Sequence, residues 1–199
     1  MLPSPGPGLR ARLRAEMRFQ AEFKFALLAV LGVIGWTLLA WQLGWHTDHF
    51  EHAQHGKKFV AAVFAITIWL AVRHRRDQQQ GGRLEFGEGF QTGMMVGAIA
   101  AFLSGFFLTF YSRVLNPGWL QRAWEWQKAG LIAAGAKEQE LGRHEAIANV
   151  SQTLIFQLLL EPIRTLIMGM ILATAVAAVL RRTPPEAEPE SSAGSPSQP

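Results

Sequence analysis

The chain has 199 residues, of which 49% are hydrophobic and 17% are charged, whereas a typical soluble domain carries about 25% charged residues. It contains no cysteine, which excludes disulfides, iron–sulfur clusters and zinc sites built from thiolates. The formal net charge is +4. Because the basic residues flank apolar blocks instead of forming one stripe, they favour contact with anionic lipid headgroups over binding of nucleic acid.

Residues 1–22 are predicted to form a basic N-terminal segment in the cytoplasm. The charged start resembles that of a signal peptide, but the apolar run that follows continues through Trp36 and Trp41 with no small-residue cleavage site,. We therefore expect an uncleaved helix. The four arginines of this segment are Arg10, Arg12, Arg14 and Arg18.

Four apolar blocks predict four transmembrane helices within one domain of residues 23–182. The first block has 19 residues, which as a helix cover roughly 28 Å, close to the ~30 Å of a hydrocarbon core. The second is shorter, but lysines and arginines on both flanks can snorkel and extend it. Pro162 is expected to begin the fourth helix, because proline suits a first helical turn. The predicted spans lie at about 25–43, 59–74, 93–114 and 162–180, an all-α integral membrane four-helix bundle.

Lysines and arginines are distributed unevenly between the two ends of these spans. Eleven lie on the side of the two termini and seven on the opposite side. Because cytoplasmic flanks carry the excess of positive charge, this distribution predicts that both termini lie in the cytoplasm.

The third connection, residues 116–151, is expected to contain interfacial amphipathic helices on the outer side. It opens with the turn signal Asn116, Pro117, Gly118,. A cluster of tryptophans beside charged residues then predicts a helix at the outer interface, with a second short helix after Gly142. The composition of the tail, residues 183–199, predicts disorder. The three tryptophans are Trp119, Trp124 and Trp126.

Small residues recur at every fourth position of the third and fourth blocks. In a bilayer, such stripes let two helix backbones approach closely and gain dispersion contacts. We therefore predict that helices three and four pack against each other through these faces, with a homodimer as the alternative. The two stripes are Gly89, Gly93, Gly97, Ala101 and Gly105, and Thr165, Gly169, Ala173 and Ala177.

The segment LEFGEGFQTGMMVGAIAAFLSGFF, followed by LNPGWL, resembles a family of small four-helix membrane proteins catalogued as domain of unknown function 4199. The likeness covers about Lys24 to Arg182. It implies four helices, a bacterial-type inner-membrane location and an extracytoplasmic third connection, and it supplies no activity. The histidine-rich first connection and the Pro/Glu/Ser tail depart from the family's usual pattern.

Four histidines, His46, His49, His52 and His55, recur at every third residue of the first connection, with Asp48 and Glu51 among them. Imidazoles and carboxylates are ligands for zinc, copper and nickel. On an α-helix, steps of three rotate a side chain by about 60° each, so two or three of the four imidazoles could converge. The alternative is that they solvate a short interfacial turn.

Glu161 and Arg164 are charged residues within the apolar stretch LIFQLLLEPIRTLIMG. If the helix begins at Pro162, both lie at the headgroup boundary, where they cap and anchor the helix. If the span begins near Leu154, they are an intramembrane ion pair that could form part of an ion path.

No phosphate-binding loop, dinucleotide fingerprint, nucleophile elbow or zincin motif is present in the sequence,. We therefore expect a non-enzymatic structural or accessory protein without a cofactor. It would act through helix packing in the lipid bilayer, with another membrane protein or with itself. The alternative is a small transporter or metal-handling protein that uses the histidine connection and the Glu161–Arg164 pair. Four short helices enclose little volume, so transport would require an oligomer or a partner.

Overall fold

The computed structural model describes residues 7–53, 55–79 and 82–181. The predictions for residues 1–6 and for the tail, residues 183–199, lie outside the described residues. The elements in chain order are α1 (Pro7–Gln42), η1 (Phe50–His52), α2 (His55–His74), η2 (Arg75–Gln79), α3 (Phe86–Phe110), η3 (Tyr111–Leu115), α4 (Trp119–Ala133), α5 (Glu138–Ser151), η4 (Phe156–Leu160) and α6 (Glu161–Leu180). The short element η1 is a 3₁₀-helix, whereas η2, η3 and η4 are π-helices.

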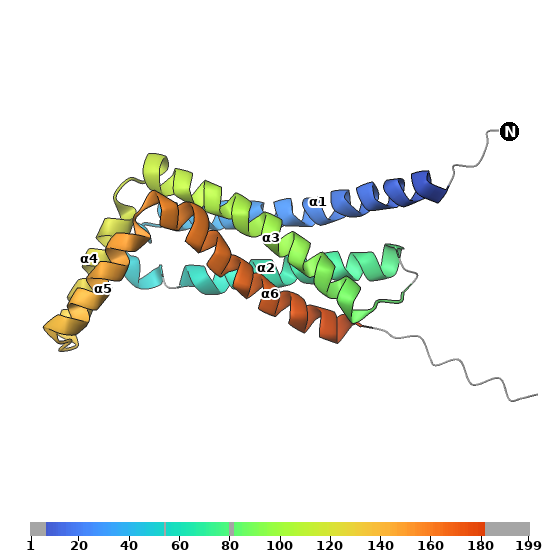
Figure 1. Ribbon diagram of the computed structural model, residues 1–199. Coiled ribbons are helices and arrows are strands. Elements are labelled where there is room, and N and C mark those ends of the chain that lie inside the picture. Colours follow the sequence, from blue (N-terminus) through green and yellow to red (C-terminus); the bar gives the residue numbers. More distant parts are fainter. Residues whose placement is uncertain (1–6, 54, 80–81, 182–199) are drawn as a thin grey trace, which may run out of the picture.

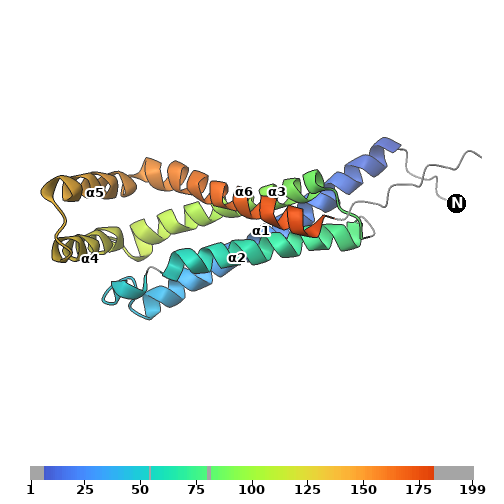
Figure 2. The same ribbon diagram turned by 90° about the horizontal axis from the view of Figure 1, so that it is seen from below.

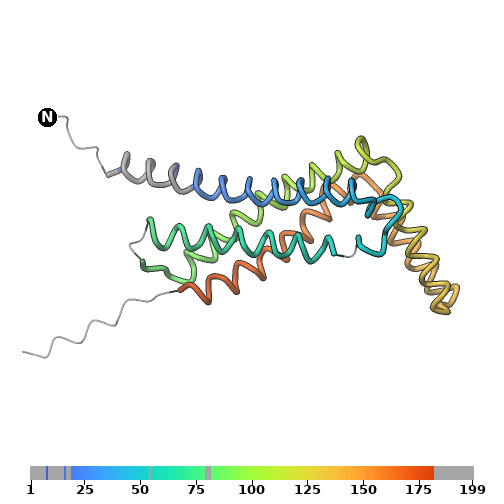
Figure 3. The backbone as a smooth tube through the Cα atoms, turned by 180° about the vertical axis from the view of Figure 1, so that it is seen from behind, coloured from blue at the N-terminus to red at the C-terminus, as the bar shows by residue number. Residues whose placement is uncertain are grey.

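Four helical segments are long and apolar enough to cross a membrane: Phe19–Gln42, Phe50–Gln78, Phe86–Leu115 and Phe156–Leu180. They lie lengthwise against one another (Figures 1 and 3), and the end of α6 returns to the end of the bundle at which α1 begins. The predicted all-α membrane bundle is confirmed, and the chain is a membrane protein.

Side chains inside the bundle differ from those on its surface. The core is made mostly of alanine, valine and other compact side chains, with Phe64 and Ile68 as its larger members. Large apolar side chains such as Leu31, Ile155 and Val179 point outward and are more than 60% exposed. Contact with lipid is as favourable for such residues as contact with protein. The close contacts between helices are therefore made by small side chains.

The two predicted small-residue stripes face each other along α3 and α6. A Cβ atom added to Gly93 would lie 2.7 Å from the Cβ of Ala173, and one added to Gly97 would lie 3.6 Å from the Cα of Gly169. Only glycine permits so close an approach at the first of these positions. The same seam continues in the pairs Gly89–Ala177 and Gly105–Pro162, while Ala101 is buried in the core and Thr165 is half-buried.

All four spanning helices begin earlier than the sequence pattern suggests, α2 at His55 instead of near residue 59. Helix α1 begins at Pro7, so the basic segment is part of it, and α3 begins at Phe86 instead of near residue 93. The fourth span begins at Phe156, and Pro162 lies inside it. The π-helix η4 directly precedes this proline, and its wider turn can accommodate the proline ring and the missing N–H,.

The third connection folds into a hairpin of α4 and α5, the two helices predicted there, although α5 begins at Glu138 instead of after Gly142. The helices lie side by side and turn away from the bundle axis (Figures 1 and 2). Gly135, with φ 79°, makes the turn between them,. An ion pair of 3.5 Å between Lys128 Nζ and Glu145 Oε2 joins the two helices.

Candidate functional site

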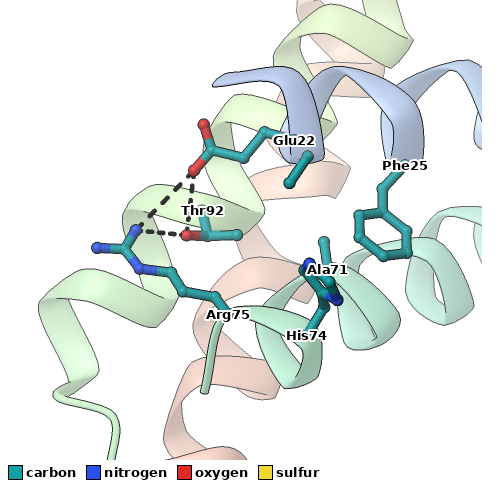
Figure 4. A pocket seen from close by; sticks show the side chains of 7 residues that line it. Glu22, Phe25, Ala71, His74, Arg75 and Thr92 are labelled. Carbon is teal, nitrogen blue, oxygen red and sulfur yellow. Dashed lines mark hydrogen bonds and ion pairs between the residues drawn. The ribbon is translucent and has the colours of Figure 1, made fainter. Parts of the chain in front are cut away.

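Charged and polar side chains from three helices meet near the end of the bundle where α1 begins and α6 ends (Figure 4). Arg75 donates from Nη1 to Thr92 Oγ1 at 2.6 Å, and the Thr92 hydroxyl donates to Glu22 Oε1 at 3.2 Å. Arg75 Nη2 also lies 3.5 Å from Glu88 Oε1. We call Glu22, Arg75, Glu88 and Thr92 the terminus-side layer.

Burial makes this layer a strong fastening between helices. Glu22 and Arg75 are only 4% and 7% exposed. A guanidinium so placed needs carboxylate and hydroxyl partners, and removing one of them leaves an uncompensated charge. The layer therefore ties together α1, α3 and the junction of α2 with η2.

A small pocket adjoins the terminus-side layer. Its volume is about 10 Å³, roughly the space that one water molecule requires. Such a pocket suits a bridging water, because polar groups line one of its sides. Its lining residues are Ala21, Glu22, Phe25, Ala71, His74, Arg75 and Thr92.

A second polar cluster lies at the opposite end, where the hairpin joins the bundle. Arg122 Nη2 donates to Asn116 Oδ1 at 2.6 Å, which turns the amide so that Nδ2 donates to Tyr111 Oη at 2.9 Å. His46 Nδ1 lies 2.7 Å from Tyr111 Oη and accepts a hydrogen bond from this hydroxyl when the neutral ring carries its proton on Nε2. We call His46, Tyr111, Asn116 and Arg122 the hairpin-side layer. It leads from a guanidinium to an imidazole.

Aromatic rings surround this chain of hydrogen bonds. The His46 ring stacks on Trp119 with centroids 4.9 Å apart, and Trp41 meets Tyr111 edge-on at 6.0 Å. Tyr111 is fully buried. Burial lowers the pKa of His46 below its usual 6.5, because desolvation disfavours the charged imidazolium. The neutral imidazole that accepts from Tyr111 is thus also the form that burial favours.

The two roots of the hairpin are bonded to each other. The Ser112 hydroxyl in η3 donates to Gln157 Oε1 in η4 at 3.0 Å, and Arg113 donates to the backbone carbonyl of Gln152. Gln152 Nε2 in turn donates to Gln121 Oε1 in α4 at 3.1 Å. Two π-helices, a form often found at functional sites, therefore meet at the base of the hairpin.

The structure does not gather the four predicted histidines around one point. His46 points to Tyr111, whereas His49 and His52 lie on either side of Glu51, 3.4 Å and 3.7 Å from its Oε1. His55 begins α2, and its ring lies 6.3 Å from that of His52. Within the part of the chain that is described, no three His, Asp or Glu side chains are placed to hold a metal ion.

Glu161 and Arg164 lie inside the continuous fourth span, and Arg164 Nη1 donates to Glu161 Oε1 at 3.2 Å. Their side chains are 41% and 62% exposed. Of the two alternatives, the span does begin near Leu154, but the pair faces away from the bundle instead of into it. It therefore does not line a path between the four helices.

Sequence reasoning missed both polar layers. Glu22 falls within the predicted basic N-terminal segment, and Arg75 is one of the basic residues that flank the second predicted span, so no contact between them was expected. A signal was present for one of them, because Tyr111 is the chain's single tyrosine and lies at the end of a span, where an aromatic ring with a polar tip is expected to bond.

Comparison with protein families bears on this architecture. A family model described as "Protein of unknown function (DUF4199)" matches residues 24–182. The chain belongs to this family. The family implied by the third helix and the Asn116–Pro117 turn is thus confirmed, and its matched region contains both polar layers except for Glu22. No curated protein and no solved structure matches the chain.

Proposed function

We propose that this chain is a non-enzymatic structural or accessory subunit of a bacterial-type inner membrane, with both termini in the cytoplasm. It holds the α4–α5 hairpin in a fixed direction outside the membrane and presents it to a partner. The observation that supports this most is the fastening of both hairpin roots: Asn116 with Arg122 at one root, and Ser112 with Gln157 across both.

The rest of the bundle supports a scaffold. The glycine seam brings α3 and α6 into close contact between the two polar layers. A helix pair in close contact along its length, and joined at the hairpin end by the buried Ser112–Gln157 bond, resists bending, because any shift would open packed contacts and that bond,. Rigidity of this kind serves positioning of an attached element.

The hairpin carries exposed apolar side chains suited to a partner. Trp126 and Ile132 on α4 are 49% and 56% exposed, and Ile147 on α5 is 64% exposed. Aromatic and large aliphatic groups of this kind are the usual anchors of protein interfaces.

Lysines and arginines support the proposed orientation. Lys24 and Arg73 are exposed near the terminus-side layer, and Arg76 is half-buried. Together with the arginines of the first turns of α1, they give this end the excess of basic residues typical of a cytoplasmic face.

The test is a mild-detergent pull-down of the tagged full chain from its native membrane, with mass spectrometry and metal analysis of the same sample. We expect a stoichiometric membrane partner that is lost when Trp126→Ala and Ile132→Ala are combined. Leu31→Ala, which alters a lipid-facing side chain of α1, is the matched control and should retain the partner. A partner that is unaffected by the hairpin variant, or a lone chain that carries zinc or copper, would contradict the proposal.

A further inference from the structure

The register of the seam fixes the depth of every residue on α6. Gly89 lies against Ala177, and Gly93 lies against Ala173, so each step of four along α3 is matched by a step of four back along α6. Gly105 lies against Pro162, within one residue of the same register. Arg164 therefore lies at about the level of Phe102 in the middle of α3, and Glu161 at about the level of Gly105.

The two polar layers lie toward the two ends of the apolar span Phe86–Leu115. Thr92 belongs to one layer and Tyr111 to the other, and the nineteen residue steps from the first to the second cover about 28 Å of helix, close to the ~30 Å thickness of a hydrocarbon core. Phe102 is then about 15 Å from one layer and about 14 Å from the other. Arg164 and Glu161 are therefore near the middle of the bilayer.

At this depth the pair faces outward. Arg164 and Glu161 bond to each other at 3.2 Å, yet their side chains remain 62% and 41% exposed on a face that also carries exposed Ile163, Ile167 and Ile171. Ionisable residues inside a membrane normally face other protein or water, because lipid tails offer them no hydrogen bonds. Contact with another protein surface would therefore stabilise this pair more than contact with lipid.

We propose that a second copy of this chain covers this face of α6. The inference rests on the proposed function as a membrane subunit and adds to it a second contact surface, separate from the hairpin and its partner. Each copy offers one carboxyl and one guanidinium three residues apart. A two-fold axis along the membrane normal places equal residues at equal depth, so Arg164 of each copy reaches Glu161 of the other diagonally, across an axial offset of about 4.5 Å. A face that carries both charges is self-complementary, as a two-fold interface requires.

The remainder of this face fits two parallel helices in contact. Between the ion pair and the end of α6, Ile167 and Ile171 are 51% and 64% exposed. Toward the end of α6 the exposed residues become small, at Thr174, Ala175 and Ala178. Such residues let backbones approach closely in lipid.

The absence of cysteine from the chain makes disulfide crosslinking a direct test. The full chain carrying Ile167→Cys or Ile171→Cys is oxidised in its membrane, and the products are separated without reductant and identified by mass spectrometry. We expect a product of two copies. It should form about tenfold faster or more than with Leu31→Cys, because an interface holds the two thiols at high effective concentration.

Leu31→Cys is a control matched in depth to Ile167→Cys. Trp41 lies beside Tyr111, and Glu22 lies beside Thr92, so Leu31 of α1 lies at the level of Ala101. Leu31 is 63% exposed. It therefore reports random collisions of chains at the depth of Arg164, from a different face.

A charge exchange separates contact between copies from the ion pair within one copy. In the Ile167→Cys background, one tagged chain carries Glu161→Arg and a second, with another tag, carries Arg164→Glu. Each chain alone has two like charges, so crosslinks between identical chains should be lost, whereas co-expressed chains should form mixed pairs. Pairing within one chain cannot produce this preference.

The outcomes distinguish failure of the second-copy contact from failure of the proposed accessory function. Crosslinking of Ile167→Cys to a different protein would overturn the second copy and leave an accessory role standing. Crosslinking no faster than the control, with no mixed-pair preference and no co-purifying protein, would overturn both. Self-crosslinking with mixed-pair preference supports the inference even if no protein binds the hairpin.

Discussion

The two polar layers do the same task with different chemistry. The terminus-side layer places a buried guanidinium between two carboxylates and a hydroxyl, whereas the hairpin-side layer passes hydrogen bonds through neutral groups to a half-buried imidazole. The first depends on charge balance and the second on bond direction. The terminus-side layer should therefore be costly to break, whereas the hairpin-side layer should be broken by smaller changes, including protonation.

The largest expected effect comes from Arg75→Met. It leaves the carboxylates of Glu22 and Glu88 close together without the guanidinium between them, so the free energy of unfolding should fall by about 3–5 kcal/mol. Thermal or denaturant unfolding of the full chain in detergent measures the loss. The matched control is Arg73→Ala, because Arg73 is exposed and pairs with Asp77. Equal stability of the two variants would remove the distinction between the layers.

The seam between the layers supplies the next test. Gly93→Ala should cost about 1–3 kcal/mol through overpacking, since its Cβ would lie 2.7 Å from that of Ala173. Gly97→Ala is the control: its Cβ would meet Gly169 at ordinary contact distance, so it should be tolerated, whereas the larger Gly97→Leu should destabilise. Hydrogen exchange should show Gly93→Ala loosening both layers together. Loss of protection in one layer alone would argue against a seam that joins them.

Tyr111→Phe should have a smaller effect. It removes the hydroxyl that links Asn116 to His46 and leaves a buried amide donor without its acceptor, at a cost of about 1–2 kcal/mol. Hydrogen exchange should report the loss in the hairpin and leave the terminus-side layer protected. Loss of protection at Thr92 would mean that the two layers are not independent.

The smallest effect is that of pH on the hairpin-side layer. The pKa of His46 is lower in the folded protein than the usual value of about 6.5,. The folded state therefore binds fewer protons than the unfolded state in this range. The contribution of His46 is fully present above about pH 6.5 and falls as the pH drops below it toward the folded pKa.

The single tyrosine gives this titration a specific signal. A ¹³C-labelled Tyr111 resonance should shift when His46 gains a proton and can no longer accept from the hydroxyl, and His46→Gln should abolish the shift. The same substitution should flatten the dependence of stability on pH. A Tyr111 signal that titrates identically in the His46→Gln variant would show that another group is responsible.

The architecture could be predicted from the sequence, because span length and small-residue spacing each follow from one physical requirement of the bilayer. The stripes at Gly93 and Ala173 pointed to the contact that the structure contains. The first residues of the helices were harder to predict from the sequence. Pro162 satisfies the rule for a first helical turn, yet the π-helix before it lets the helix continue upstream. The preference of proline for a first helical turn was outweighed by the π-helix beside it.

The candidate site was harder to predict, because its residues are distant in sequence and unremarkable alone. Glu22 and Thr92 are separated by 70 positions, and no pattern in the sequence near either residue predicts a contact with the other. The histidine spacing, by contrast, was conspicuous but did not lead to convergence. Regular spacing selects a common face only on a continuous helix, and the connection that holds His46 and His49 is a series of turns.

The π-helices at the roots of the hairpin have a consequence for helical phase. Each π-turn holds about one residue more than the α-turn it replaces, and one residue corresponds to about 100° of rotation around a helix. Deleting one residue within Tyr111–Leu115 and one within Phe156–Leu160 would return both to α-helix. The faces of α3 and α6 could then keep their phase while the hairpin took a new direction. The bundle and the hairpin are thus separately adjustable: length changes at these two points re-aim the hairpin, whereas a deletion within the seam would rotate every later contact out of place.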